Sequence, residues 1–458
     1  MPTRRFKMLD AILFVILLLI GHGCSVKNKF SIINFAHLYN HAEKPLITGL
    51  KIFHESDSNS RVYVRYKPSS LHYVLKMGRS YYRADYSISY RLFSSYESAA
   101  IVDSSTFKMF DSLYFQNDLS LVYNFPIKTL PDNNYVVEIK FSDSNRGIDS
   151  YYSQEINRKD ANNSQHFLLV DQQDEVIFEE WVSWKTKFRI ITPKTNLTKL
   201  FVDYYDDVFP AARTPFSLSH SPVYQLKPKE KYILEINDGI TDYLQYGREG
   251  FFHFRSDSMT KDGFTIFRFH DDYPEIKESE LMPGPMRYIT TDPEYAMLAA
   301  SKEPQTIVEK FWIEVAGNER RGFQLLENYY DLVKDANLFF TSYKEGWKTD
   351  RGMIYMIFGA PTEVFKKSEI ETWIYGDPQK RTRLHFDFIQ NKNPFTTNDF
   401  ELVRQPDYKN PYFVAVDYLR RYWTTTGNAI FFKAKLLLII KRLPLLNFLS
   451  ALLLINRS

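Results

Sequence analysis

Two pairs of residues are the first candidates for chemistry in this sequence. His37 and His41 stand four residues apart, which would place them on one face of a helix. A zinc protease also needs a general-base glutamate directly after the first histidine, and Leu38 occupies that position. His385 and Asp387 lie two apart on an expected strand, where they would share a face. Neither pair has an evident third ligand or nucleophile nearby, so we predict no catalytic residue, no metal site and no cofactor.

Other signatures of catalysis and binding are missing from the sequence. It contains no Gly-x-Ser-x-Gly elbow, no phosphate-binding P-loop and no dinucleotide fingerprint. The formal net charge of +3 comes from the two ends of the chain, and the body between them is nearly neutral. A neutral body offers no electrostatic footprint for nucleic acid, so we predict no nucleic-acid partner.

Cys24 is the only cysteine in the chain, so it has no internal disulfide partner. It follows a basic start and the apolar run 11–20, with Gly21 and Gly23 close before it. This order is typical of an export signal, and the run is too short to span a membrane. The arrangement resembles a bacterial lipoprotein signal, which implies that Cys24 becomes the mature N-terminus and carries acyl chains. The alternative is a plain signal peptide with an unmodified cysteine.

The resemblance also implies a location. Residues 25–29 lack the acidic cluster that some double-membraned bacteria use to send lipoproteins to the cell surface. We therefore expect a protein of the cell envelope, an outer membrane lipoprotein that faces the periplasm and is held to the membrane through acylated Cys24.

The C-terminal end is apolar and basic. Residues 429–455 are strongly apolar, but four basic residues and Pro444 interrupt them, and no charge-free piece reaches the ~18 apolar residues of a membrane span. Two explanations stay open. The segment is an interfacial helix on an anionic membrane surface, or it results from an altered reading frame.

The composition favours β-structure in the first two thirds of the chain. Aromatic residues reach 16%, and they favour pleated, half-buried strand surfaces. Because they are spread along the chain, packing is the preferred explanation, with platforms for sugar or peptide as the alternative. Segments with the strand pattern are 61–66, 86–92, 135–141, 175–181, 187–191, 231–236 and 264–269. We predict two antiparallel, sandwich-like β domains from them.

The C-terminal third has a different pattern. An apolar stripe between Leu326 and Phe340 recurs every three or four residues, which predicts an amphipathic helix. A polar turn at 345–352 follows, and the apolar run 353–358 after it is expected to be a strand. Further strands are expected at 371–375 and 384–388, and a helix at 412–423.

The residues around this turn resemble the GWxTD domain family. The matching residues are Gly346, Trp347, Thr349, Asp350, Arg351, Gly352, Phe358, Gly359 and Pro361, with Phe311-Trp312 and Asp335-Ala336-Asn337 upstream. The resemblance covers roughly residues 300–424. It implies an α+β domain found largely in exported envelope proteins, and it implies no known catalytic activity.

Elementary chemistry gives these residues structural roles. Gly346 can supply a positive φ at the helix exit, and Trp347 can pack the helix against the sheet. Thr349 or Asp350 can accept hydrogen bonds from exposed backbone N–H groups, while Asp350 pairs with Arg351 or another base. The functional alternative makes Asp350 and Arg351 a ligand-contacting pair.

The predicted architecture is multi-domain, with N-terminal all-β domains followed by an α+β C-terminal domain. Its parts are a lipoprotein signal peptide at 1–24, a sandwich-like domain at 25–170, a second β domain at 171–273, a linker at 274–299, a GWxTD-like domain at 300–424 and an apolar basic tail at 425–458.

Three functions follow as hypotheses. The preferred one is a membrane-anchored binding or scaffolding module with an envelope protein as partner. The second is an envelope hydrolase acting on glycan, peptidoglycan or peptide, with Asp350, Arg351, His385 and Asp387 forming a site. Such a site requires these four side chains to meet in one cleft. The third is a structural subunit of a secretion or motility assembly.

Overall fold

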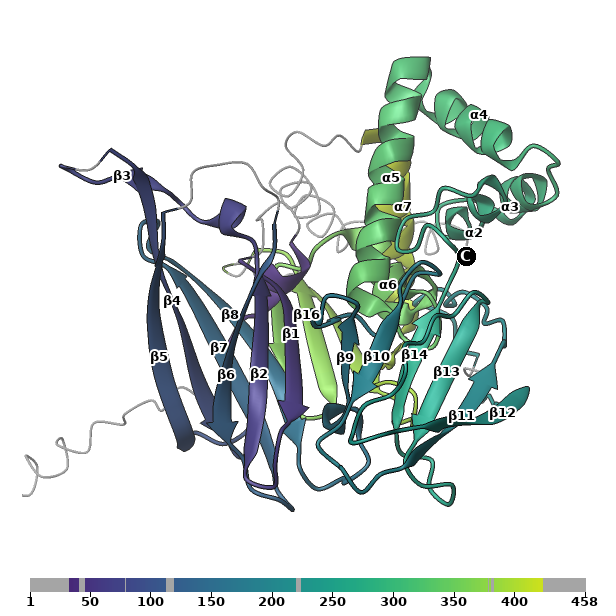
Figure 1. Ribbon diagram of the computed structural model, residues 1–458. Helices are drawn as coiled ribbons and strands as arrows, with labels where there is room; N and C mark the ends of the chain where they lie inside the picture. The colour runs from purple at the N-terminus through teal and green to yellow at the C-terminus, as the bar shows by residue number, and fades with distance from the viewer. Residues whose placement is uncertain are drawn as a thin grey trace, which may run out of the picture.

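The structure is a computed structural model that describes residues 33–40, 46–78, 80–112, 119–219, 224–377, 379 and 383–422. Cys24, His41 and the tail 425–458 lie outside the described residues, as do the hypotheses that rest on them. The described chain consists of a β-sandwich, a second β region and a mixed helical and sheet region (Figure 1).

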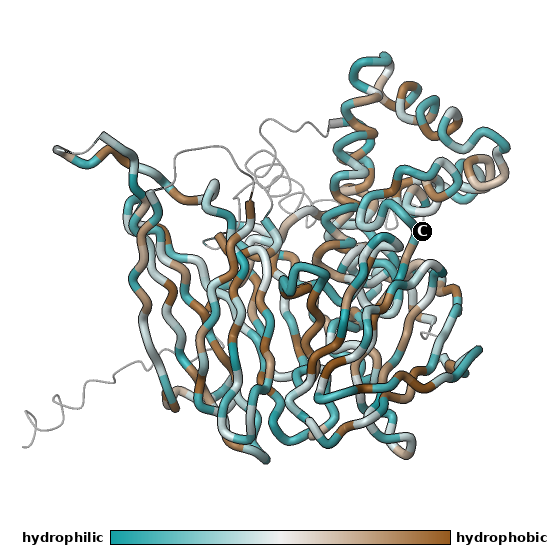
Figure 2. The backbone as a smooth tube through the Cα atoms, in the orientation of Figure 1, coloured by the Kyte–Doolittle hydropathy of each residue, from teal (hydrophilic) through white to brown (hydrophobic). Residues whose placement is uncertain are grey.

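The N-terminal sandwich is built from two antiparallel sheets. One sheet has the order β1-β2-β6 and the other β3-β4-β7-β8, with β5 pairing to β4. The strands are β1 (Ile47–His54), β2 (Asn59–Tyr66), β3 (Val74–Leu75), β4 (Tyr82–Phe93), β5 (Ile101–Asp111), β6 (Leu121–Lys128), β7 (Asn134–Asp143) and β8 (Ile148–Asn157). Buried positions alternate along β2 and β4, as predicted, and together with β7 they supply much of the core. Figure 2 shows the same alternation of hydrophobic and hydrophilic positions.

The second β region follows as two further sheets. One pairs β9 (Leu168–Asp171) with β10 (Phe188–Ile191), and the other has the order β12-β11-β13-β14. Its strands are β11 (Lys199–Tyr205), β12 (Glu230–Glu235), β13 (Gly250–Arg255) and β14 (Phe264–Arg268). One face of this second sheet packs over β9 and β10 in a common hydrophobic cluster.

The predicted strand at 175–181 is wrong. Only Val176 and Trp181 form isolated bridges there. The segment instead contacts the N-terminal sandwich. The Phe178 ring lies against Gly49, and the Glu179 carboxylate accepts a hydrogen bond from Arg65 at 2.5 Å. These tertiary contacts override an apolar, alternating local pattern.

The C-terminal region combines helices with a four-stranded antiparallel sheet of order β15-β16-β17-β18. Its main helices are α3 (Asp292–Ala299), α4 (Pro304–Ala316), α5 (Glu319–Phe340), α6 (Asp350–Phe358) and α7 (Lys409–Tyr422). Its strands are β15 (Glu363–Lys366), β16 (Ile370–Tyr375), β17 (Leu384–Gln390) and β18 (Phe400–Leu402). The predicted amphipathic helix is α5, which with α4 projects away from the sheets (Figure 1).

The apolar run 353–358 is helical rather than extended. All of its side chains are buried, so the run carries no periodicity that separates a helix from a strand. The helical state is indicated by the residues at the start of the run, because Thr349 is the N-cap of α6 and Asp350 occupies its first turn.

The predicted linker at 274–299 is packed structure. It contains η5 (Ser279–Leu281), α2 (Pro283–Met286) and α3, and Met286 and Ile289 are fully buried in the C-terminal core. Proline and acidic residues in this stretch begin short helices, with Pro283 and Pro293 in first turns.

The segment at 33–40 also joins the C-terminal core, although the sequence assigns it to the N-terminal domain. Its 3-10 turn η2 (Ala36–Tyr39) lies beside β15, and the Phe35 N–H donates to the Val364 carbonyl at 2.9 Å. Asn34 Oδ1 accepts from the Val364 N–H at 2.9 Å. Residues more than 300 positions apart therefore share one cluster of buried side chains.

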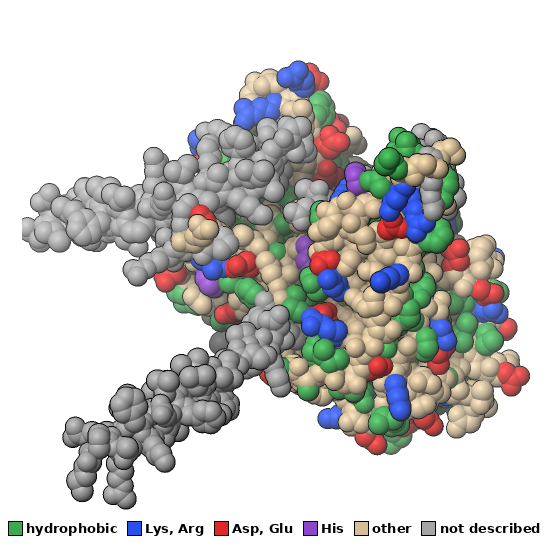
Figure 3. Space-filling model, turned by 90° about the vertical axis from the view of Figure 1, so that its left-hand side faces the viewer, with side chains coloured by type: hydrophobic (Ala, Val, Ile, Leu, Met, Phe, Trp, Pro, Cys, Tyr) green, Lys and Arg blue, Asp and Glu red, His purple; other side chains and the backbone are tan. Residues whose placement is uncertain are grey.

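Two surface observations complete the fold. No helix among the described residues is both long and apolar enough to cross a bilayer. On the face shown in Figure 3, basic and acidic side chains are mixed among hydrophobic ones, so this face has no patch of a single charge sign.

His54 makes stability of the sandwich depend on pH. Its Nε2 donates to the Asn157 carbonyl at 3.0 Å, its Nδ1 accepts from the Ser60 hydroxyl at 2.8 Å, and burial lowers its pKa to about 4. Below the ordinary histidine pKa of about 6.5, His54 is protonated in the unfolded chain but stays neutral in the folded chain. The free energy of unfolding therefore falls as the pH drops toward 4. Between pH 7 and pH 5 this contributes a loss of about 2 kcal/mol.

Urea unfolding of the wild type and His54→Gln at both pH values measures this contribution. The wild type should lose about 2 kcal/mol more than the variant over this interval, because the neighbouring His166, whose pKa is lowered mainly by burial, remains buried in both proteins. Equal losses in the two proteins would contradict the assignment.

Candidate functional site

The motif forms a tight junction between the end of α5 and the start of α6. A Cβ on Gly346 would lie 2.0 Å from the Ala336 carbonyl oxygen, and one on Gly352 would lie 2.0 Å from the Gly346 carbonyl oxygen. Gly346 sits in the short helix η6 (Gly346–Lys348), and it is not among the positive-φ glycines. The predicted positive φ is therefore wrong, and close backbone approach is the reason for glycine.

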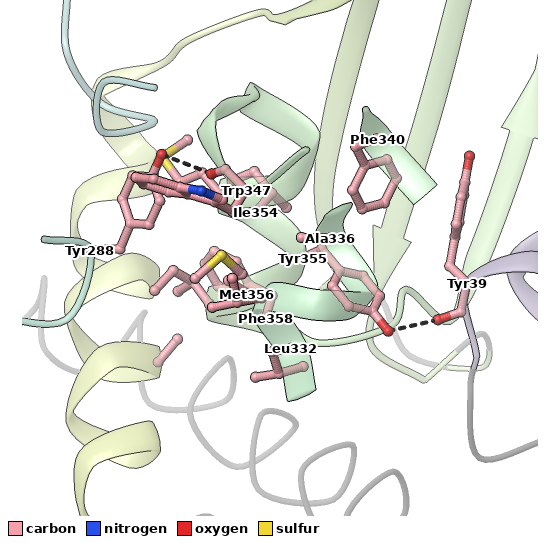
Figure 4. Packing of buried hydrophobic residues seen from close by; sticks show 14 of the residues in the cluster. Tyr39, Tyr288, Leu332, Ala336, Phe340, Trp347, Ile354, Tyr355, Met356 and Phe358 are labelled. Atoms are coloured by element: carbon pink, nitrogen blue, oxygen red, sulfur yellow. Dashed lines mark hydrogen bonds between the residues drawn. The ribbon is translucent and has the colours of Figure 1, made fainter. Parts of the chain in front are cut away.

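Trp347 is buried inside this junction. Its backbone N–H donates to Asn337 Oδ1 at 3.1 Å, and its indole N–H donates to Glu345 Oε1 at 3.2 Å. The Tyr288 hydroxyl donates to its carbonyl at 3.1 Å (Figure 4). The ring lies against Gly284 of α2, so Trp347 packs the junction against α2. The sequence had predicted that Trp347 packs the helix against the sheet.

Thr349 and Asp350 bond to backbone N–H groups, as predicted. Thr349 Oγ1 accepts from the Gly352 N–H at 3.0 Å and caps α6. Asp350 Oδ2 accepts from the Leu402 N–H of β18 at 2.8 Å. These two contacts fix the first turn of α6 against the sheet.

Asp350 forms its ion pair with Arg404, and not with its neighbour Arg351. Arg404 donates to Asp350 Oδ1 at 2.5 Å and to Oδ2 at 2.9 Å, a two-pronged contact between side chains only 8% and 9% exposed. Sequence reasoning missed Arg404, because it lies 54 positions downstream and belongs to no recognisable local pattern.

Arg351 points to a different set of partners. Its guanidinium donates to Glu371 Oε2 at 3.4 Å and to the Asn398 carbonyl at 3.0 Å, and it stacks over the Phe400 ring. Glu371 Oε1 also accepts from the Tyr39 hydroxyl and from the Trp373 indole N–H, each at 2.7 Å. Arg351 is therefore buried in a network that includes the N-terminal segment, which argues for a structural role.

The residues after α6 complete the motif. Gly359 ends the helix with φ 71°, and its carbonyl accepts from the Tyr375 hydroxyl at 2.8 Å. Phe358 is fully buried against Phe386, and Pro361 is also buried. Glycine at this position does satisfy a positive φ.

A cleft of about 1220 Å³ lies beside the motif. Its floor includes one face of the inner strands β11 and β13, with Asp203, His253 and Arg255, and Asp350 and Arg404 also line it. Its walls come from residues outside those two strands: 210–213, 224–231, 258–261, 391–401 and, in addition, Arg287, Tyr343 and Lys344.

The floor is held by internal contacts. Arg255 pairs with Asp203 at 2.9 Å, and its guanidinium also donates to the carbonyls of Ser258 and Thr260. His253 bonds to Thr265 Oγ1 and to the Lys261 carbonyl, and burial lowers its pKa. Most polar atoms of these groups are engaged within the floor, while the Nε atoms of Arg255 and Arg404 have no hydrogen-bond partner in the described part of the chain, so these groups mainly shape the cleft.

The walls carry cations without acidic partners. Within the described chain, five basic side chains that line the cleft lie beyond ion-pair distance of any carboxylate. They are Lys227, Lys231, Lys261, Arg287 and Lys344. A cleft with such walls concentrates a positive field and attracts anions.

The four residues of the hydrolase hypothesis do not meet in this cleft. Asp350 lines it, but Arg351, His385 and Asp387 do not. His385 is exposed on β17, and Asp387 accepts from the Thr372 hydroxyl at 2.6 Å. Asp350 and Arg351 are each held in a separate buried ion pair.

Only one residue of the candidate metal-binding pair His37 and His41 is described by the structure. His37 lies in η2 with its Nε2 at 2.5 Å from the Tyr151 carbonyl, while His41 lies outside the described residues. Across the described residues, no three His, Cys, Asp or Glu side chains are grouped to hold a metal ion.

Comparison with known families matches residues 250–421 to the GWxTD domain. The chain is a GWxTD domain-containing protein. The match begins in β13, so it includes β13, β14 and the short helices before residue 300 in addition to the predicted 300–424. The cleft of this GWxTD protein is lined by residues both inside and outside the matched range.

No curated protein matches this GWxTD protein. A transglutaminase structure from red sea bream is similar at 12% sequence identity and a TM-score of 0.18, over 51% of this chain and 33% of the transglutaminase. The chain spans about a third of the length of that protein.

Gly346→Ala tests the close approach at the junction. The new methyl group meets the Ala336 carbonyl, which cannot move without shifting α5, so the variant should lose about 3 kcal/mol of local stability. Hydrogen exchange of peptides from α5 and α6 measures the loss. Gly247→Ala is the matched control, because nothing lies within 4 Å of its added Cβ. Unchanged exchange in α5 and α6 would contradict this packing.

A double-mutant cycle tests the Asp350–Arg404 pair. Asp350→Ala removes both close carboxylate contacts of the buried Arg404 guanidinium, which keeps only Glu401 at 3.7 Å, and should cost about 3 kcal/mol in urea unfolding. Asp350→Ala with Arg404→Ala should cost less than the sum of the single changes. Asp417→Ala, which breaks the exposed pair with Arg421, should cost below about 0.5 kcal/mol. A coupling energy near zero would show that the two buried charges act independently.

Proposed function

We propose that this GWxTD protein is a non-catalytic binding or scaffolding module of the cell envelope, held to the outer membrane through acylated Cys24 and facing the periplasm. The observation that carries the binding role is the cleft beside the motif. Its floor groups mostly bond within the protein, and its walls present five cations that have no carboxylate partner among the residues that the structure describes. Such a site is suited to holding an anionic group and has no arrangement of nucleophile and base.

The position of the N-terminal segment supports the anchoring role. Residues 33–40 dock against β15 and the buried network around Glu371. Nine chain steps separate Cys24 from Ile33, and a fully extended chain spans at most about 30 Å over that number. An acyl anchor on Cys24 would therefore keep Ile33, and the part of the GWxTD domain against which residues 33–40 dock, within about 30 Å of the membrane surface.

The second candidate function is a structural subunit of a secretion or motility assembly. It differs from the binding-module hypothesis in one observable, because a subunit of an assembly co-purifies with defined partners at fixed stoichiometry. Crosslinking in membranes followed by purification under detergent separates the two, since a binding module yields the chain alone, with ligand, or with a partner protein at variable stoichiometry.

Metabolic labelling with a clickable fatty acid tests the anchor. The wild type should take up label and fractionate with the outer membrane, and Cys24→Ala should lose the label and move to the soluble periplasmic fraction, because its acyl chains are the membrane attachment. Ser25→Ala is the matched control and should behave as the wild type. If neither protein is labelled and both stay in membranes, the lipoprotein hypothesis fails and residues 429–455 become the candidate anchor.

A further inference from the structure

We infer that the cleft beside the GWxTD motif binds an acidic oligosaccharide, a sugar chain that bears repeated carboxylate or phosphate groups. This inference rests on the proposed function as a binding module and names its ligand class. It is carried by the charge of the cleft, its aromatic side chains and the kind of surface that forms its floor.

The charge balance of the cleft is strongly positive. Nine Lys and Arg residues line it against four Asp and Glu residues. Two of the acids, Asp203 and Asp350, are neutralised by Arg255 and Arg404 within the floor. Since Lys227, Lys231, Lys261, Arg287 and Lys344 keep no carboxylate partner in the described chain, the positive charge on the walls is available to a ligand.

Aromatic rings lie among these cations. Tyr224 is 38% exposed, and Tyr343, Phe395 and Phe400 are half-buried in the wall of the cleft. The faces of sugar rings are apolar on their C–H sides and lie flat on such rings, while lysines reach the acidic substituents. Rings and cations together match an acidic sugar better than a small inorganic anion, which needs no aromatic surface.

The size and floor of the cleft favour a chain of sugars over a peptide. Its volume of about 1220 Å³ exceeds the usual range of about 300–1000 Å³ for small-molecule sites. An extended peptide is commonly bound by pairing with a free strand edge. Here the floor is the face of β11 and β13, which are inner strands with neighbours on both sides, so the floor offers side chains and no free strand edge.

Isothermal titration of the purified full-length chain tests the inference with three probes of similar length. Tetragalacturonic acid carries a carboxylate on each sugar, and maltotetraose is its neutral counterpart. Tetraglutamate with an acetylated N-terminus and an amidated C-terminus carries the same number of carboxylates on a peptide. We expect binding of tetragalacturonic acid that weakens with added salt, no binding of maltotetraose, and weaker binding of tetraglutamate.

Two sets of variants locate the binding. The triple variant Lys227→Gln, Lys231→Gln and Lys344→Gln should weaken tetragalacturonic acid about tenfold or more, because each exposed charge contributes modestly. Tyr224→Ala should weaken tetragalacturonic acid and leave tetraglutamate unchanged. Lys302→Gln, an exposed lysine before α4 and outside the cleft lining, should have no effect. Thermal unfolding confirms that each variant is folded.

Three outcomes would overturn the inference. They are the absence of binding by either acidic probe, equal affinity in the triple variant, and tetraglutamate binding in the absence of tetragalacturonic acid binding, which would identify an acidic peptide. Failure here is distinct from failure of the anchor. A chain that is acylated but binds no oligosaccharide rejects the ligand class alone, and a chain that binds but is not acylated rejects the anchor alone.

Discussion

Two adjacent charges of opposite sign, buried at the start of α6, constrain the rest of the C-terminal region. Asp350 and Arg351 are consecutive, yet each is satisfied by a different distant partner, Arg404 in one case and Glu371 in the other. Burying a charge is expensive unless it is paired and hydrogen-bonded, so these contacts must form together with the fold. They fix α6 between β18 and β16, and the glycines of the junction let α6 approach the end of α5 closely enough to reach them.

The same constraint sets the shape of the cleft. Arg351 donates to the Asn398 carbonyl, and the Asn398 amide donates to the Thr341 carbonyl at 2.9 Å, which holds the segment that carries Phe395. Asp350 places Arg404 on the floor, and Arg404 also donates to the Arg213 carbonyl at 3.3 Å. The motif therefore acts on the cleft mainly by position. Its charged residues stabilise the surface on which other side chains meet a ligand.

Local sequence patterns predicted the elements whose periodicity was clear. They failed where contacts between distant residues determine the secondary structure or bring side chains together. The sandwich strands β2, β4 and β7, and helix α5, follow from alternation and amphipathic spacing. The run 353–358 has no polar face, so its helical state depends on the Thr349 cap rather than on period. Thr349 and Asp350 were assigned backbone contacts correctly. Thr349 bonds locally within the first turn of α6, whereas the partner of Asp350 is the Leu402 N–H, 52 positions away, which the sequence could not identify. Arg404 and the cationic walls were not found, because their proximity exists only after the sheets and the motif have packed.

The buried network also connects the segment next to the proposed anchor with the cleft. The Tyr39 hydroxyl donates to Glu371, Glu371 accepts from Arg351, and Arg351 donates to the Asn398 carbonyl beside the cleft wall. Each link is a hydrogen bond between buried or half-buried groups, where bonds are electrostatically strong and loss of one partner is costly. Because Tyr39 lies only a few residues beyond the first described position, the orientation of the cleft is fixed relative to the point where the chain would leave for the membrane. If Cys24 is acylated as proposed, the length of chain between Cys24 and Ile33 limits how far this network, and the cleft wall joined to it, can lie from the membrane surface.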